Sequence, residues 1–180
     1  NLYGLKMFNA NTGICFNSDN ILRTENGGQD WRIIYTGFPT FNKSVSMVDN
    51  DIGYMLVDSV TLIKTINGGI SWNFVYSGSN IKNSTLYFFS NSTGFAFRKL
   101  NNSLYSNAIL KTTSGGTNWI TVYEDSTFLI NSIQFVNQLT GFAAGSQYVG
   151  YNHTKLIKTT NGGISWDSLQ VSFLFNYPKV

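Results

Sequence analysis

Short apolar runs separated by Asn, Ser, Thr and Gly recur along the whole chain. Each run holds about four to six residues and is rich in β-branched and aromatic types, a pattern typical of β-strands bounded by turns. No stretch shows the 3.6-residue spacing of apolar positions that an amphipathic helix requires. The hydrophobic pattern therefore predicts an all-β protein built from many short strands.

The runs are organised in a unit that occurs four times. Its clearest part aligns without gaps as ILRTENGGQDW, LIKTINGGISW, ILKTTSGGTNW and LIKTTNGGISW. Each segment ends on one of the four tryptophans of the chain, Trp31, Trp72, Trp119 and Trp166. Successive tryptophans are 41, 47 and 47 residues apart. A Gly-centred motif precedes each segment (MFNANTGICF, MVDNDIGYML, FFSNSTGFAF and FVNQLTGFAA), and an apolar run follows each tryptophan (RIIYTG, NFVYSG, ITVYED and DSLQVS).

Each unit thus supplies four strands, which we name A, B, C and D in chain order. Strands A and B flank the Gly-centred motif, C is the Leu/Ile-Lys/Arg-Thr run, and D follows the tryptophan; the A strands are expected around Phe8, Val48, Phe89 and Val136. A four-stranded antiparallel sheet repeated every 41 to 47 residues has the size of one propeller blade. We predict one β-propeller domain over residues 1–180, with four blades at about 3–38, 44–79, 84–126 and 131–172.

The segment between strands C and D, here called the box, has the same four key residue types in every unit, with Ser for Asn in the third copy. The box residues are Thr24, Asn26, Gly28, Trp31, Thr65, Asn67, Gly69, Trp72, Thr112, Ser114, Gly116, Trp119, Thr159, Asn161, Gly163 and Trp166. We expect the Asn or Ser side chain to bond backbone two residues on, and the glycines to adopt a positive φ. The tryptophan would then pack against the neighbouring strand or blade.

We interpret the box as structural, because a feature present in every unit serves the blade itself. It carries no carboxylate at its third position, so no metal site is predicted. A basic residue also recurs in strand C and is assigned to the blade for the same reason: Arg23, Lys64, Lys111 and Lys158.

Composition and charge exclude several classes of protein. With 42% hydrophobic, 16% aromatic and 12% charged residues, the chain is too apolar to be disordered. The net charge is +3, but the basic residues are spread singly, so no nucleic-acid partner is predicted. No apolar stretch approaches the ~20 residues of a membrane span, and we expect the chain not to span a membrane. The single cysteine, Cys15, is expected in the core.

The Thr-x-Asn-Gly-Gly-x-x-Trp box resembles the Asp-box (BNR) repeat of sialidases and related propellers. The whole unit, a Gly-Phe strand followed by Leu-Lys-Thr-Thr-Asn-Gly-Gly-x-x-Trp, is similar to photosystem II stability/assembly factor propellers, over residues 3 to about 172. The resemblance implies a secreted or cell-surface bacterial protein, and hence an extracytoplasmic location. It favours a non-enzymatic module without a cofactor that binds a protein or a glycan.

Two alternative functions follow from the same resemblance. Sialidases hold their substrate with three arginines from different blades, beside a Tyr–Glu pair and an acidic Asp. This chain has three arginines, and two of them, Arg23 and Arg32, lie at the box, while the acids show no obvious pairing. No catalytic residue is therefore predicted, although a fragment of a sialidase-like glycoside hydrolase stays an alternative. An assembly factor for a membrane complex is the other, but the arginine-rich patch it would need is absent.

Departures from the repeat indicate where a binding site could lie. The distance from the Gly-centred motif to the box tryptophan is 18 and 19 residues in units 1 and 2, but 25 in units 3 and 4. The extra residues fall in the B–C connections, which share one face of a propeller with the D–A connections. Tyr and Arg in such loops suit protein or glycan contact, and a lone His is no metal site. The candidate residues are Arg98, Lys99, Tyr105, Tyr148, Tyr151 and His153.

The number of blades bears on whether the ring closes. Propellers have about four to eight blades, and 17 residues separate each box tryptophan from the next A-strand position, whereas 14 residues follow Trp166. We therefore expect the chain to be part of a larger propeller. Further blades or a neighbouring subunit would then cover its open edges.

Overall fold

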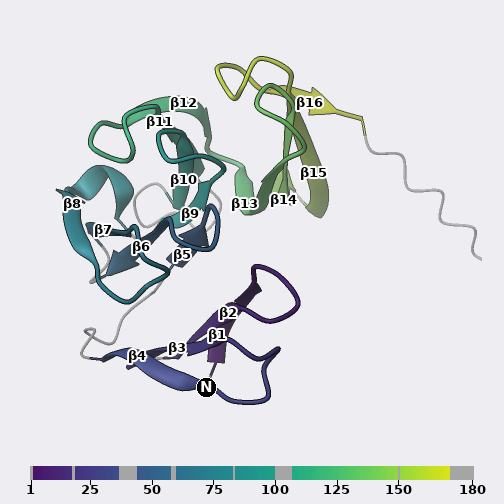
Figure 1. Ribbon diagram of the computed structural model, residues 1–180. Helices are drawn as coiled ribbons and strands as arrows, with labels where there is room; N and C mark the ends of the chain where they lie inside the picture. Colours follow the sequence, from purple (N-terminus) through teal and green to yellow (C-terminus); the bar gives the residue numbers. More distant parts are fainter. Residues whose placement is uncertain are drawn as a thin grey trace, which may run out of the picture.

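The computed structural model describes residues 2–17, 19–36, 44–57, 60–82, 84–99, 107–149 and 151–170. They form four four-stranded antiparallel sheets, each with its strands side by side in chain order. The sheets stand around a common centre with the first strand of each sheet innermost (Figure 1). The prediction of an all-β propeller with four blades is confirmed. The helical segment among the described residues is a single 3-10 turn, η1 (Ser79–Ile81).

Each blade follows the predicted order of strands A to D. Blade 1 consists of β1 (Leu2–Met7), β2 (Gly13–Asn17), β3 (Asn20–Thr24) and β4 (Arg32–Thr36). Blade 2 consists of β5 (Ser44–Met47), β6 (Gly53–Val57), β7 (Thr61–Thr65) and β8 (Asn73–Ser77). Blade 3 consists of β9 (Thr85–Phe88), β10 (Gly94–Lys99), β11 (Asn107–Thr112) and β12 (Ile120–Asp125). Blade 4 consists of β13 (Phe128–Phe135), β14 (Gly141–Val149), β15 (Tyr151–Thr159) and β16 (Asp167–Leu169).

Each A strand ends one residue before the position around which the sequence places it, because that residue opens the A–B turn. Its backbone N–H donates to the carbonyl four residues on, as from Phe8 to Thr12 at 2.8 Å. The next side chain accepts two backbone N–H groups of the turn, and Asn9 Oδ1 accepts from Asn11 and Thr12, each at 2.8 Å. Equivalent bonds in the other blades are accepted by Asp49, Ser90 and Asn137.

Each C strand ends on a buried threonine whose hydroxyl organises the C–D turn. In blade 2, Thr65 Oγ1 accepts the N–H groups of Asn67 (3.3 Å) and Gly69 (2.9 Å) and donates to Asn67 Oδ1 (3.0 Å). Asn67 Oδ1 also accepts the N–H of Ser71 at 2.9 Å. The expectation that the Asn side chain bonds the backbone two residues on is wrong. The Asn67 side chain instead accepts the N–H of Ser71, four residues on, because Thr65 already accepts the N–H of Gly69, two residues on.

Both glycines of every box have a positive φ, between +64° and +91°, as predicted. The second glycine also meets the preceding blade closely, since a Cβ on Gly116 would lie 2.4 Å from Leu62 Cδ2. Its carbonyl accepts the indole N–H at 2.8 to 3.1 Å in three of the boxes, from Trp31, Trp72 and Trp119. The indole nitrogen of Trp166 is buried without a hydrogen-bond partner among the described residues.

The first box glycine ties the C–D turn to the A–B turn of the same blade. Gly27 donates its N–H to the Asn11 carbonyl at 2.8 Å. The same bond, at 2.8 to 2.9 Å, is donated by Gly68, Gly115 and Gly162. The A–B and C–D turns therefore share one face of the propeller, and the B–C and D–A connections lie on the opposite face, as expected.

The core lies between blades. We call the side of a blade toward the next blade in the chain its forward face, and the side toward the preceding blade its rear face. Three buried clusters occupy the three junctions, and each joins forward-face residues of one blade to rear-face residues of the next. Between blades 2 and 3, Tyr54 stacks on Phe88 with ring centroids 3.7 Å apart. Trp119 meets Phe88 edge-on at 6.0 Å, so the box tryptophan packs at the junction.

Polar side chains cross the same junctions from the forward face. Arg23 donates to the Gly68 carbonyl at 3.2 Å, and Lys64 donates to Asn91 Oδ1. Tyr54 donates its hydroxyl to the Asn91 carbonyl at 2.6 Å. In blades 1 and 2 the recurring basic residue of strand C thus contacts a turn of the next blade, which agrees with the assignment of this position to the blade.

The innermost strands protect one another's open edges. An edge strand exposes backbone N–H groups that invite unwanted pairing. Ser44 and Ser46 of β5 accept, through their hydroxyls, the N–H groups of Leu86 and Phe88 of β9, each at 2.7 Å. Tyr87 of β9 accepts the N–H of Phe135 of β13 at 3.2 Å. A side-chain oxygen on one A strand therefore accepts a backbone N–H at the open edge of the next A strand.

Blades 1 and 4 stand at the two ends of an open arc (Figure 1). Leu5 and Met7 on the rear face of blade 1 are 63% and 38% exposed, whereas the equivalent Leu86 and Phe88 of blade 3 are 5% and 3% exposed. Among the described residues, the rear face of blade 1 thus lacks the cover that the internal junctions have. The open arc fits the expectation that further blades or a neighbouring subunit cover these ends.

Replacing Thr112 by Val tests the role of the box hydroxyl. Thr112 Oγ1 accepts the N–H groups of Gly116 (3.0 Å) and Ser114 (3.2 Å), and the side chain is 1% exposed. Val keeps the shape but removes the acceptor, so the buried N–H of Gly116 loses its partner. We expect the free energy of unfolding to fall by about 1–3 kcal/mol, measured by urea denaturation followed by tryptophan fluorescence. Thr113→Val at the exposed next position is the control, and equal stability of the two variants would contradict the assignment.

Candidate functional site

The longer B–C connection of blade 4 is a hairpin of paired strands, so the expectation of a loop is wrong there. Tyr148 pairs with Asn152, and Val149 with Tyr151. β14 and β15 have nine residues each, against five or six in the B and C strands of the other blades. The extra residues therefore lengthen the sheet of blade 4 on the B–C face of the propeller.

The hairpin brings three of the candidate residues onto one element. Tyr148 and Tyr151 lie beside its end, and His153 pairs with Gln147 on the same two strands. These statements concern the backbone, since the side chains of the three candidates lie outside the described part of the structure. Tyr105 lies wholly outside it.

The candidates of blade 3 lie at the end of β10. Arg98 pairs with Ala108, and Lys99, whose side chain is also outside the described part, pairs with Asn107. Arg98 alternates with Phe97 of the blade 3–4 cluster, so its side chain is on the rear face of blade 3, toward blade 2. Its Nε is buried without a hydrogen-bond partner among the described residues. Arg98 is thereby separated from the β14–β15 hairpin, which belongs to the far side of the next junction.

A polar network joins β12 to the base of the hairpin. Lys155 forms an ion pair with Asp125 at 2.5 Å, and both side chains are mostly buried, with exposed fractions of 12% and 16%. Tyr123 donates to Asp125 Oδ2 at 3.1 Å, and Thr127 donates both its backbone N–H and its hydroxyl to Oδ1 at 2.7 Å. Gln147 donates to the Thr127 hydroxyl at 3.2 Å. The network fixes the hairpin to blade 3.

The network shifts the pKa of its charged members. Burial alone would raise the pKa of Asp125, but the hydrogen bonds from Lys155 and from Thr127 outweigh it and lower the pKa to about 2. Burial alone would lower the pKa of Lys155, but the hydrogen bonds to Asp125 and Tyr123 outweigh it and raise the pKa. Both groups are therefore charged near neutral pH, and the ion pair is a structural contact at the blade junction.

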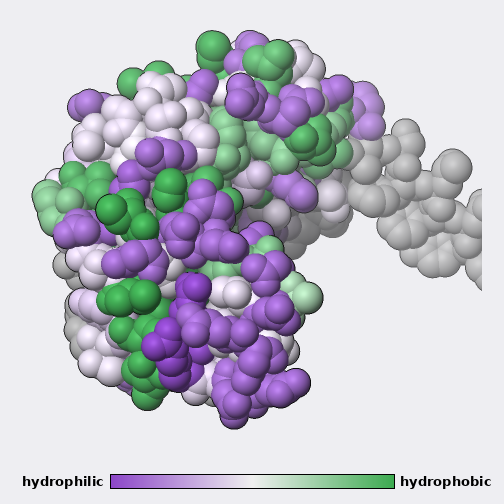
Figure 2. Space-filling model, viewed as in Figure 1, coloured by the Kyte–Doolittle hydropathy of each residue, from purple (hydrophilic) through white to green (hydrophobic). Residues whose placement is uncertain are grey.

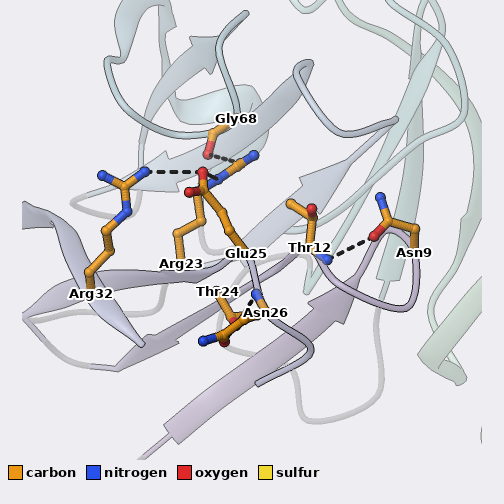
Figure 3. Close-up of polar contacts among 8 residues, drawn as sticks. All are labelled: Asn9, Thr12, Arg23, Thr24, Glu25, Asn26, Arg32 and Gly68. Atoms are coloured by element: carbon orange, nitrogen blue, oxygen red, sulfur yellow. Dashed lines mark hydrogen bonds and ion pairs between the residues drawn. The ribbon is translucent and has the colours of Figure 1, made fainter. Parts of the chain in front are cut away.

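A second acid is paired on the opposite face, at the box of blade 1. Glu25 Oε1 accepts from Arg23 Nε at 3.2 Å and from Arg32 at 3.1 Å (Figure 3). The hydrogen bond from Arg23 and the charge of Arg32 lower the pKa of Glu25. Arg23 also reaches the Gly68 carbonyl of blade 2, and two of the three arginines thus serve the box turns.

A hollow of about 540 Å³ lies at the centre of the arc, between strands β1, β5 and β9. Its lining combines apolar and polar side chains, among them Lys6, Phe16, Ser46, Val48, Tyr87 and Phe89. Sequence reasoning did not find this feature, because it is formed by inner strands of different blades. Elsewhere, apolar and polar side chains are interspersed over the face of the molecule shown in Figure 2.

Two further classes of site were searched for in the part of the chain that the structure describes. No cluster of three His, Cys, Asp or Glu side chains there could hold a metal ion. The described residues also contain no helix whose length and hydrophobicity would allow it to cross a membrane. Cys15 is buried, as expected.

No protein-family model and no curated protein matches the chain. Solved structures do resemble it. YCF48 bound to a D1 peptide aligns with a TM-score of 0.60 and 15% identity over 93% of this chain and 66% of that chain. YCF48 from Cyanidioschyzon merolae aligns with a TM-score of 0.65 and 16% identity over 96% and 57%. The GH74 enzyme of Niastella koreensis aligns with a TM-score of 0.67 and 17% identity over 93% and 30%.

These similarities show a shared β-propeller fold. The chain spans 66% and 57% of the two YCF48 chains and 30% of the GH74 enzyme, so each of those proteins is considerably longer than the part this chain matches. The group contains a peptide-bound protein and a glycoside hydrolase, and the fold alone therefore leaves the function open.

Replacing Asp125 by Asn tests the ion pair at the base of the hairpin. The folded-state pKa is lowered, so Asp125 stabilises the fold above its ordinary value of 3.8 and loses that contribution as the pH falls toward 2. We expect Asp125→Asn to lower the free energy of unfolding by about 1–3 kcal/mol near neutral pH. The difference from the wild type should shrink between pH 4 and pH 2. Urea denaturation across this pH range is the measurement.

The control for this experiment is Glu124→Gln, which removes one carboxylate from the exposed neighbouring position of the same strand. It should leave the free energy of unfolding near neutral pH close to that of the wild type, because the side chain of Glu124 is exposed. A difference between wild type and Asp125→Asn that stays constant from neutral pH to pH 2 would contradict the role of the charge.

Proposed function

We propose that the chain is a non-enzymatic propeller scaffold that binds a protein partner through the face bearing the β14–β15 hairpin. The observation that carries this proposal is the length of the hairpin, nine residues in each strand. Blades 1 and 2 connect strands B and C within the ordinary repeat. In repeat proteins, insertions of this kind commonly occur on the binding face.

The residue types of the hairpin favour recognition of a protein. Tyr148 and Tyr151 flank its end, one on each strand. Tyrosine offers a flat apolar surface and a polar tip at a small cost in side-chain entropy, and it is enriched where interfaces carry most of their energy. The ion pair of Lys155 with Asp125 holds the base of the hairpin against blade 3, so the tyrosines are presented from a fixed support.

A structural neighbour supports a protein ligand over a glycan. YCF48 has been solved bound to a D1 peptide, and this chain aligns with 66% of that protein. A propeller of this architecture can therefore bind a peptide. The identity of 15% carries over no contact residue, so the site in this chain is argued from its own hairpin.

Two acids of the described part are held in ion pairs that serve the blades. Glu25 is paired with Arg23 and Arg32, and Asp125 with Lys155. These two carboxylates are structural contacts, which is compatible with a scaffold. The similarity to GH74 enzymes keeps a hydrolase fragment as the second candidate, to be separated by the experiment below.

We place the scaffold outside the cytoplasm, as part of a secreted or cell-surface bacterial protein. This part of the proposal is supported by the resemblance of the box unit to repeats of such proteins. A glycan ligand and a role in assembling a membrane complex are the competing versions of the binding function.

Replacing Tyr148 and Tyr151 by Ala together tests the proposed binding face. Peptides are first selected by display against the immobilised wild-type chain, and their affinities are measured by isothermal titration calorimetry. We expect the double variant to bind about tenfold more weakly or worse, because it loses two large contact surfaces. Its thermal unfolding should match the wild type, since both residues lie at the end of the hairpin, away from the junction clusters.

Phe74→Ala is the matched control, because this aromatic side chain is 68% exposed on the outer strand β8. It should bind the selected peptides as the wild type does. Equal loss in both variants, or no loss in the tyrosine variant, would remove the hairpin from the site. Binding confined to oligosaccharides on a glycan array would favour a glycan ligand, and release of reducing sugar from a polysaccharide would favour a hydrolase fragment.

A further inference from the structure

One charged side chain at the junction between blades 2 and 3 has no counter-charge among the described residues. Arg98 lies on the rear face of blade 3, at the end of β10 that leads to the B–C face, and its side chain is partly buried. Its Nε is buried without a hydrogen-bond partner, and no described acid forms an ion pair with its guanidinium. A partly desolvated charge that nothing neutralises is unfavourable for folding. Arg98 therefore lowers the stability of the fold, which indicates a role other than packing.

A second unpartnered polar atom lies next to Arg98. Ser84 is 4% exposed, and its hydroxyl oxygen is buried without a hydrogen-bond partner among the described residues. The pairing of β9 with β10 extends to Thr85 and Phe97, so Ser84 and Arg98, the next residue of each segment, are cross-strand neighbours. A hydroxyl donates one hydrogen bond and a guanidinium donates several. The two side chains thus combine a positive charge with polar atoms that have no partner in the described part.

This polar pair is a departure from the repeat. The position four residues after the B-strand glycine is Arg98 in blade 3, Val57 in blade 2 and Gly145 in blade 4. Val57 is 8% exposed and belongs to the apolar cluster between blades 1 and 2. The equivalent of Ser84 in blade 4 is Ile130, which pairs with Gly145 and is 4% exposed. The other blades therefore need no polar pair at this level of the junction.

The junction between blades 3 and 4 shows how the propeller neutralises a basic residue at the same level. Lys155, which pairs with Gly145, is held by Asp125 of the preceding blade. Asp125 lies six residues after the box tryptophan of blade 3, and the residue six positions after Trp72 in blade 2 is Gly78. Glycine has no side chain, so blade 2 provides no acid at the position from which blade 3 provides one. The preceding blade thus supplies this counter-charge at one junction and not at the other.

We propose that Arg98 and Ser84 bind a carboxylate from outside the chain, at the B–C end of the junction between blades 2 and 3. The guanidinium fork matches the two oxygens of a planar carboxylate. One negative charge neutralises Arg98, whereas a phosphate dianion would bring excess charge beside Ala108, which pairs with Arg98 and is 0% exposed. The carrier of the carboxylate, an acidic side chain or the chain end of a protein partner, rests on the function proposed above; the binding of the carboxylate itself does not.

Nuclear magnetic resonance can follow this site directly, because the chain has three arginines. Arg23 and Arg32 both contact Glu25, so their Nε–H signals serve as internal references, and an Arg98→Lys variant assigns the third signal. Sodium acetate replaces sodium chloride at constant ionic strength. We expect the Arg98 signal to shift along a saturable curve while the two reference signals stay in place.

Substitutions separate binding from folding. Ser84→Ala removes one hydrogen-bond donor and should weaken acetate binding about threefold to tenfold. Arg98→Leu should abolish acetate binding and, in chloride, should unfold at a higher urea concentration than the wild type, because it removes the unpaired charge. Acetate should raise the urea midpoint of the wild type but not that of Arg98→Leu. Arg32→Leu is the matched control, since the same change at an arginine that is 61% exposed should leave acetate binding unchanged.

Three further probes identify the source of the anion. N-acetylglycine represents a chain end, and the α-amide of N-acetylaspartate represents an acidic side chain. The probe that binds more tightly assigns the carrier of the carboxylate. Sodium phosphate tests the competing anion, and tighter binding of phosphate than of every carboxylate would overturn the proposal.

The proposal also fails if the Arg98 signal stays unchanged, or if it shifts linearly with acetate and in proportion to the Arg32 signal. Asp58, the one acidic side chain outside the described residues, is tested by Asp58→Asn. If this variant binds acetate more tightly than the wild type, the counter-charge belongs to the chain itself and the proposal is wrong. The peptide experiment on Tyr148 and Tyr151 is independent of this outcome, because acetate is followed at Arg98, on a different blade.

Discussion

The hydroxyl of the threonine that ends each C strand is the contact on which the propeller depends. It accepts the N–H of the second box glycine, and this bond holds the turn in a conformation that glycine tolerates best. The turn also sets how closely two blades approach. A Cβ added at Gly69 would lie 3.2 Å from Ile34 of the preceding blade, so glycine allows the close packing seen there. A single buried acceptor in each blade thus connects local geometry to the spacing of the blades and to the placement of the tryptophan beside them.

Each junction combines dispersion and apolar burial with a few directed hydrogen bonds. Stacked rings such as Tyr54 on Phe88 fill the junction, and the hydroxyl of Tyr54 reaches a carbonyl of the next blade. Burial raises the pKa of Tyr54 to about 12, so the donor keeps its proton over the range in which proteins work. Side-chain oxygens on the inner strands satisfy the neighbouring edge. The core is therefore distributed over the junctions, and each blade is stabilised by its contacts with the neighbouring blades.

Most of the fold could be predicted from the sequence because the repeat shows it four times. The four tryptophans define the boxes, and the glycine pairs predict the turns that the structure contains. The spacing of the repeat locates the extra residues of blade 4 but does not show that they pair, because the strands of this hairpin are defined by their pairing partners. The ion pair of Asp125 with Lys155 spans 30 residues and two blades, so no local pattern could reveal it. The contacts of Arg23 and Lys64 likewise depend on how adjacent blades are oriented.

The direction of the junctions has a consequence for how such a protein can grow. Every blade packs its forward face on the rear face of the next blade. An in-frame duplication of one unit therefore adds a blade whose two faces already fit its neighbours. The 41- and 47-residue units differ in the B–C connection, on the side away from the turns that clamp neighbouring blades. Length can therefore change there while the clamps stay the same. If whole units were copied and single B–C connections were lengthened afterwards, the boxes would stay nearly identical while the B–C hairpins came to differ.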